Sequence, residues 1–346
     1  MPVLQAQQLA DLVATTLREL NKPSFVDISS DLQRHTVNNF IRQNRVELQS
    51  GTGVQWSVMV NHNGSARNVG LGGQDEINRI DTMTLATADW RNSVASYSFI
   101  GQEIAMNREP ARIVNIVKQG RHACMVSLAE LMEGNLWGPP VAFTDAVTPW
   151  GIKTWIVKNA SEGFNGGAPS GYTVIGLNPT TYPRFKNYTF PYTNVTPDDF
   201  IAKLDKAATF CDFMPAVEDF PNLVKGVDWG FFTNYAVIGA LQQQLRAQNE
   251  NLGADIDKYS GGVRFRRMPV TWVPKLEADT TGPFYGINYN TFKTIILDGW
   301  WLNQTDIAHY PGQHTTEAHF LDSTYQWCCY DRRANFVGST GTSEPS

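Results

Sequence analysis

The chain has 346 residues, 42% of them hydrophobic, and its 33 acidic residues outnumber 28 basic ones, which gives a net charge of −5. This length and composition predict about two folding units with a substantial core. No stretch reaches the ~20 apolar residues that span a bilayer, and the N-terminus lacks a signal-peptide pattern, so we expect a soluble protein made inside a cell. The mild charge, without a run of Lys or Arg, gives no support for tight or sequence-specific nucleic-acid binding.

Two helical patterns open the chain. Apolar residues recur at helical spacing over residues 4–20 and stop at Asn21-Lys22-Pro23, which predicts an amphipathic arm that docks on another surface. A shorter pattern over residues 32–41 predicts a second helix.

A long polar arm is predicted over residues 51–101. Its outgoing strand alternates cleanly, so that Val54, Trp56, Val58 and Val60 share one face, and strand-like runs return at residues 82–85 and 94–100. Asparagines and glycines form the tip between them. Because an isolated two-stranded ribbon is marginally stable in water, we expect another copy of the protein to cover this apolar face.

A long helix is predicted over residues 108–133. Asn107 is the candidate N-cap, Pro110 falls in the first turn, and Gly134 closes the pattern. Apolar residues, Cys124, Leu128 and Leu131 among them, recur every three or four positions, as in a structural spine about 39 Å long.

Beyond Pro149, short strands and two helices are expected. Strands are predicted at residues 152–157, 172–176, 263–265, 270–273, 284–287, 294–297, 315–320 and 324–330. One helix begins with Thr196 as its cap, followed by proline and two carboxylates, Asp198 and Asp199, which suit the positive end of a helix dipole. Asn234 precedes the second helix.

Candidate chemical sites are weak in this sequence. His309, His314 and His319 lie near Glu317, but the spacing misses the zinc-protease templates, and in a strand His314 and His319 point to opposite faces. The glycines at 51–53 and 70–73 fit neither a dinucleotide loop nor a phosphate loop. No nucleophile, base and orienting group share a motif. We therefore predict no catalytic, cofactor or metal site.

Two further residue types have competing interpretations. The cysteines, Cys124, Cys211, Cys328 and Cys329, include no Cys-x-x-Cys pair, which favours free, mostly buried thiols. Trp300, Trp301 and Trp327 could stack on sugars, although core or subunit contact is the commoner role of such residues in a β-rich region.

The order of these parts resembles the major capsid proteins of tailed double-stranded-DNA bacteriophages, which have the α+β Hong Kong ninety-seven fold. Residues 176–187 look like the entry to that family's axial domain, and residues 229–234, 267–270 and 284–288 resemble its later elements. The resemblance implies an N-terminal arm (1–50), an extended E loop (51–105), a peripheral domain with the spine helix (106–148), an axial domain (149–289) and a return to the peripheral domain (290–346).

The resemblance also implies a non-catalytic shell subunit. Such a protein would assemble into hexamers and pentamers of an icosahedral or prolate head in the host cytoplasm, and would remain in the virion. It would enclose double-stranded DNA without binding it specifically. Its partners would be further copies of itself, a portal protein and a separate scaffolding protein; whether decoration proteins attach is left open. Subunit contacts are predicted at Val54, Trp56, Val58, Val60, Arg67, Arg79, Trp90 and Arg91, with the arginines in ion pairs.

One departure from the family and two alternatives remain. Some members cross-link through an E-loop lysine, but no lysine lies between Lys22 and Lys118 here. A bacterial encapsulin shares the fold and packages enzymes in place of DNA. A β-rich carbohydrate-binding protein or glycosidase would explain the tryptophans, and would be a monomer that binds sugar.

Overall fold

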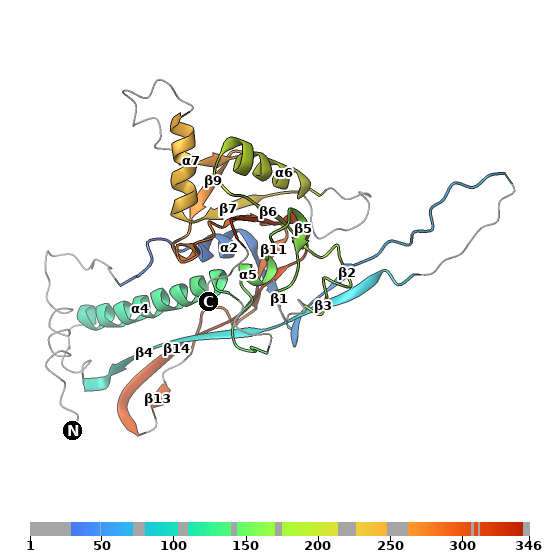
Figure 1. The fold of residues 1–346 in the computed structure, drawn as a ribbon. Helices are drawn as coiled ribbons and strands as arrows, with labels where there is room; N and C mark the ends of the chain where they lie inside the picture. The colour runs from blue at the N-terminus through green and yellow to red at the C-terminus, as the bar shows by residue number, and fades with distance from the viewer. Residues whose placement is uncertain are drawn as a thin grey trace.

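The computed structural model describes residues 29–48, 50–71, 80–102, 110–139, 144–169, 175–213, 226–247, 262–305, 308–310 and 312–341. Within these ranges the chain has a mixed α+β architecture, as predicted (Figure 1). The predicted amphipathic arm at residues 4–20 and the candidate cap Asn107 lie outside the described residues.

The described helices differ in length and in how well the sequence predicted them. They are α2 (Val37–Asn44), α4 (Pro110–Trp137), α5 (Ile152–Trp155), α6 (Ala202–Phe210) and α7 (Tyr235–Ala247), with a π-helical turn at Pro197–Ile201 and 3-10 turns at Pro274–Leu276 and Arg332–Ala334. The helix starts at Thr196 and Asn234 are confirmed: each side chain accepts a backbone hydrogen bond, from Asp199 at 3.4 Å and from Val237 at 3.2 Å. The strand predicted over residues 152–157 is wrong, because a short apolar run can equally form a buried helix.

The long helix α4 extends further than predicted. It spans 28 residues, about 42 Å, and passes through Gly134 to Trp137. Leu136 and Trp137 are fully buried, and this burial outweighs the ~1 kcal/mol that a helical glycine costs. Cys124 and Leu128 face the core as predicted, whereas Leu131 is 46% exposed.

A six-stranded sheet is organised by one long strand, β14 (Gln313–Cys329). β11 (Phe292–Leu297), β12 (Asn303–Gln304), β13 (Ala308–Tyr310) and β4 (Arg91–Ile100) all pair with β14 antiparallel, and β1 (Arg45–Leu48) pairs with β11 in parallel. The sequence predicted two strands in place of β14 and placed residues 94–100 in the arm. Residues 315–320 and 324–329 are extended as predicted, but they belong to one strand. Residues 94–100 are also a strand, but they pair with β14 and not with the hairpin, in a continuous ladder from Ile100–Thr316 to Arg91–Tyr325.

A seven-stranded sheet forms the second layer of the molecule. Its order is β5 (Gly163–Gly166), β6 (Asn187–Pro191), β15 (Phe336–Ser339), β10 (Phe284–Asn288), β7 (Trp229–Thr233), β9 (Met268–Trp272) and β8 (Arg264–Phe265). Buried apolar residues of α6 and α7 pack in a common core with this sheet. Because β15 returns to it after β14, the predicted C-terminal unit, 290–346, contributes to both sheets.

The two sheets meet at buried aromatic and polar groups. Phe40 of α2 contacts the rings of Trp137, Phe232 and Phe292 with centroids 5.3–6.5 Å apart. Arg332, fully buried, donates to the carbonyl oxygens of Trp155 at 2.6 Å, Phe185 at 3.2 Å and Gly166 at 3.3 Å, and also to that of Gly167. These acceptors come from three separate segments, so one guanidinium joins them.

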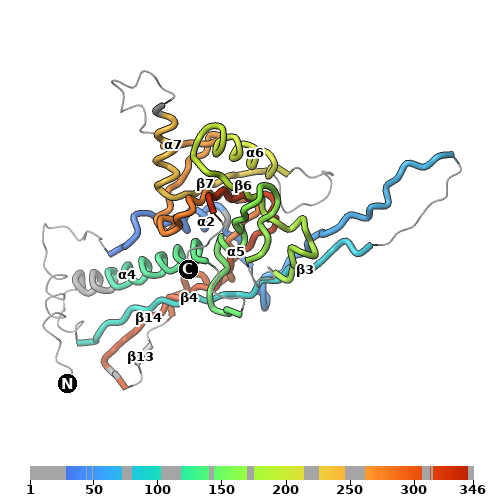
Figure 2. Tube along the Cα trace, viewed as in Figure 1, coloured from blue at the N-terminus to red at the C-terminus, as the bar shows by residue number. Residues whose placement is uncertain are grey.

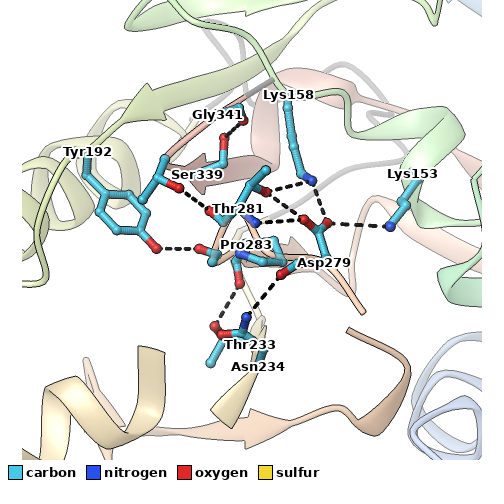
Figure 3. Close-up of polar contacts among 12 residues, drawn as sticks. Lys153, Lys158, Tyr192, Thr233, Asn234, Asp279, Thr281, Pro283, Ser339 and Gly341 are labelled. Atoms are coloured by element: carbon cyan, nitrogen blue, oxygen red, sulfur yellow. Dashed lines mark hydrogen bonds and ion pairs between the residues drawn. The ribbon is translucent and has the colours of Figure 1, made fainter. Parts of the chain in front are cut away.

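Asp279 is the centre of a buried ionic cluster (Figure 3). Its Oδ2 lies 2.5 Å from Nζ of Lys158 and 3.6 Å from Nζ of Lys153, and all three side chains are almost completely buried. Thr281 donates from Oγ1 to Oδ1 of Asp279 at 2.7 Å. Burial alone would raise the pKa of Asp279, but the Lys158 ammonium and the Thr281 hydroxyl lower the pKa below its usual value.

Two glutamates of α4 hold the chain that leads into α2. Glu133, fully buried, accepts hydrogen bonds from Oγ1 of Thr36 at 2.6 Å and from the backbone N–H of Val37 at 2.7 Å. Glu130 accepts from the backbone N–H of Asp31 at 2.7 Å. A carboxylate at the first residue of α2 satisfies a helix N–H that would otherwise lack a partner.

Candidate subunit-contact surface

A hairpin of β2 (Gly53–Met59) and β3 (Met83–Asp89) projects away from both sheets (Figures 1 and 2). The two strands pair antiparallel from Gly53–Asp89 to Met59–Met83. Because successive side chains on a strand point to opposite faces, the hairpin has two distinct faces.

The inner face of the hairpin lies on its own chain. Val54 and Trp56 are 3% and 8% exposed, next to buried Ala86 and Ala88 of β3. The ring of Trp56 meets that of Tyr330 edge to face at 5.3 Å. The expectation that another copy must cover this face is therefore wrong for Val54 and Trp56. The base of the hairpin packs on its own chain, at Tyr330, the residue directly after β14.

The same face becomes less covered toward the tip. Val58 and Val60 are partly buried and still touch the edge of the core. Residues 61–71 are all exposed. The hairpin thus has a rooted base and a distal part that the described chain does not cover.

The outer face of the hairpin carries the apolar residues that lack cover. Met59, Met83 and Leu85 are 57%, 47% and 53% exposed, and Met59 lies directly opposite Met83 in the register. Ser57, the neighbour of Met59 on this face of β2, lies opposite Leu85. The sequence analysis missed this face, although Met59, Met83 and Leu85 occupy the alternate positions of the same two strands.

The remaining predicted contact residues have different environments. Trp90 is partly buried, and its Nε1 donates to the carbonyl of Gly51 at 2.9 Å. Arg91 is 7% exposed and donates to the carbonyls of Trp90 and Asp145, so it is an internal residue and its prediction as a subunit contact is wrong. Arg67 is exposed on the tip segment, and Arg79 lies outside the described residues.

His319 and Asp199, which the sequence offered as candidates for chemistry, make contacts within the fold. The His319 ring stacks on Tyr97 at 5.2 Å, and its Nδ1 lies 3.2 Å from the carbonyl oxygen of Thr305. Asp199 accepts bonds from Lys203 and from the backbone of residues 193 and 194, and these bonds lower its pKa to about 2. Within the described ranges, no three His, Cys, Asp or Glu residues are grouped as metal ligands would be.

The tryptophans and cysteines are mostly interior residues. Trp327 is 1% exposed, so its ring is not available for sugar stacking. Trp301 is partly buried, with its ring edge to face with Tyr325 and the Arg45 guanidinium 5.8 Å from the centre of its ring. Trp300 is 49% exposed. The cysteines are free and buried, as predicted. No helix in the described part of the chain is long and apolar enough to cross a membrane.

Comparisons with known proteins show where this fold occurs. No family model and no curated protein sequence matches the chain. Solved structures do match over nearly its whole length. A chain of the cyanophage A-1(L) capsid asymmetric unit superposes with a TM-score of 0.65 at 12% identity, covering 93% of this chain and 97% of the other. The capsid of a native GTA particle gives 0.57 at 13% identity (94% and 97%), and Gordonia phage Cozz gives 0.53 at 13% identity (95% and 92%).

The chain therefore has the fold of phage capsid proteins, with matches that cover 93% and 94% of its length. At these identities the comparison establishes fold alone. The resemblance that the sequence suggested is confirmed at that level.

Proposed function

We propose that this protein is the major capsid protein of a tailed bacteriophage, a structural subunit that assembles into the hexamers and pentamers of a head enclosing double-stranded DNA. The observation that carries the proposal is the coverage: 93% of this chain matches 97% of a cyanophage capsid subunit, so little of either chain is left for another role. The protein would be part of the virion and would assemble in the host cytoplasm with a portal and a scaffolding protein.

The hairpin arm supplies the proposed contact between subunits. Its inner face packs on its own chain and fixes its direction, while Met59, Met83 and Leu85 present an apolar outer face to a neighbouring copy. Such a contact joins different surfaces on the two partners, and contacts of this kind form a ring when the rotation between successive copies closes. Arg67 of the exposed tip is proposed to take part in ion pairs between copies.

Expression of the chain alone and with a scaffolding protein tests the proposal. We expect capsomer rings or closed shells in negative-stain electron microscopy, and particles of matching mass by light scattering. A chain that remains a monomer at high concentration under both conditions would overturn the proposal.

Substitution of the outer face tests the contact itself. The double variant Met83→Ser, Leu85→Ser removes exposed apolar surface, so the isolated subunit should unfold at the wild-type denaturant concentration while particle yield falls at least tenfold. Ser57→Thr, on the same face, is the matched control and should assemble normally. Normal assembly of the double variant would exclude this face as a contact.

A further inference from the structure

The turn between β8 and β9 holds two arginines in a backbone conformation that residues with a Cβ rarely adopt. β8 and β9 pair antiparallel up to Phe265–Met268, so Arg266 and Arg267 form a two-residue turn. Their φ angles are +44° and +70°, whereas turns of this kind usually have Asn or Gly at these positions. Backbone strain clusters at ligand-binding and switching sites, so the turn is a candidate site.

Three arginines lie within the four residues 264–267. Arg264, Arg266 and Arg267 are all exposed, and Arg264 lies on β8 at the edge of the seven-stranded sheet. Figure 1 shows β9, the partner of β8, near α6 and α7, on the side of the molecule away from β4 and β14. Short length and a charged side chain are usual means of keeping a sheet edge from pairing. Edge protection by Arg264 therefore explains neither the second and third arginines nor the strain in the turn.

Arg266 attaches the turn to α6. Its Nη2 donates to Oδ1 of Asp205 at 2.9 Å, to the carbonyl oxygen of Asp205 at 3.2 Å and to Oγ1 of Thr209 at 2.6 Å. The strand ahead of the turn is fixed by Phe265, whose ring meets that of Phe231 edge to face at 5.3 Å. Both attachments hold the turn in place before any ligand arrives, which lowers the entropy lost on binding.

We propose that Arg264 and Arg267 bind phosphate groups of double-stranded DNA, and that Arg266 is the residue that positions them. A guanidinium group presents a planar fork of N–H donors that fits the oxygens of a phosphate. Phosphates repeat along each DNA strand, so neighbouring arginines can each contact one, which an isolated carboxylate would not allow. The inference rests on the proposed function, which supplies the enclosed DNA, and it names residues that touch it. So few phosphate contacts give weak binding without sequence preference.

Duplex binding across a salt series tests the two arginines. The purified protein is titrated with a random DNA duplex, and each phosphate contact contributes about 0.9 to the slope of log affinity against log salt. Arg264→Gln with Arg267→Gln should therefore lower the slope by about two. Arg184→Gln with Lys275→Gln removes two exposed positive charges elsewhere, and this matched control should keep the wild-type slope. An unchanged slope in the first variant, or an equal fall in both, would overturn the inference.

Particle formation and the source of the phosphate are separate readouts. Wild-type protein that assembles but has no affinity for the duplex at low salt would overturn the inference and leave the shell function intact. A chain that never assembles would overturn the proposed function, while its salt slope would still report on the arginines. Inorganic phosphate is the second probe, and it should not shift the urea midpoint of wild type. A shift that the double variant abolishes would identify a site for free phosphate and refute DNA as the ligand.

Arg267→Gly separates binding from folding. Glycine adopts a φ of +70° without the clash of a Cβ, so the urea midpoint of this variant should be no lower than that of wild type. Its salt slope should fall by about one. A lower midpoint with an unchanged slope would show that Arg267 serves folding alone, and would overturn its role in binding phosphate.

Discussion

Replacement of Trp56 by alanine should destabilise the single subunit, because its side chain is buried within its own chain. A buried tryptophan removes about 200 Å² from water, worth about 5 kcal/mol at about 25 cal/mol per Å². Substitutions of this kind in protein cores cost roughly 3–5 kcal/mol. The edge-to-face contact with Tyr330 is lost together with the packing.

Urea unfolding of the isolated subunit, followed by tryptophan fluorescence and circular dichroism, measures this loss. Trp56→Phe is the matched variant: it keeps a ring against Tyr330 and removes an indole N–H that has no hydrogen-bond partner among the described residues, so it should lose less than about 1.5 kcal/mol. A Trp56→Ala subunit that unfolds at the wild-type urea concentration would refute the placement of the hairpin base in the core.

Three further outcomes are expected. Arg332→Lys should lower the free energy of unfolding by about 3 kcal/mol, because an ammonium cannot reach the carbonyls of three segments; an unchanged urea midpoint would contradict this. The lowered pKa values of Asp279 and Asp199 contribute stability above about pH 4, and this stability is lost as pH falls. Between pH 5 and pH 2 the free energy of unfolding should therefore fall more steeply for wild type than for Asp199→Asn. Equal slopes would exclude this role for Asp199. Purified capsomers should bind a random DNA duplex weakly and release it by ~200 mM salt; tight or sequence-selective binding in a salt series would exclude an inert inner wall.

Caps and alternation in the sequence correctly predicted the elements that depend on neighbouring residues. Thr196 and Asn234 cap helices where their neighbours predicted, and alternation from Val54 onward correctly located β2. Alternation also showed that the strand has one apolar face, but it could not show what covers that face. Tyr330, which meets Trp56, is far away in the sequence, so the packing could not be derived from the strand itself.

Long-range polar contacts were equally invisible in the sequence. Glu133 resembles any solvated glutamate on a helix, although it accepts the first N–H of α2. Arg332 lies beside Arg333 in a short turn, and nothing in its neighbours indicates complete burial. The apolar periodicity also predicted that the helix ends at Gly134. The pattern contains no information on the core that Leu136 and Trp137 fill, so it could not predict the last turn of α4.

The two glutamates of α4 fix the chain ahead of α2 at two successive points. A pull on the chain ahead of residue 30 reaches the Glu130 carboxylate first, at Asp31, and the Glu133 carboxylate next, at Val37. Both carboxylates belong to a helix of 28 residues, so the hydrogen bonds share that load with α4 ahead of the Phe40 ring between the sheets. Movement of the start of the chain must therefore break two sets of carboxylate hydrogen bonds before it draws Phe40 out of the core.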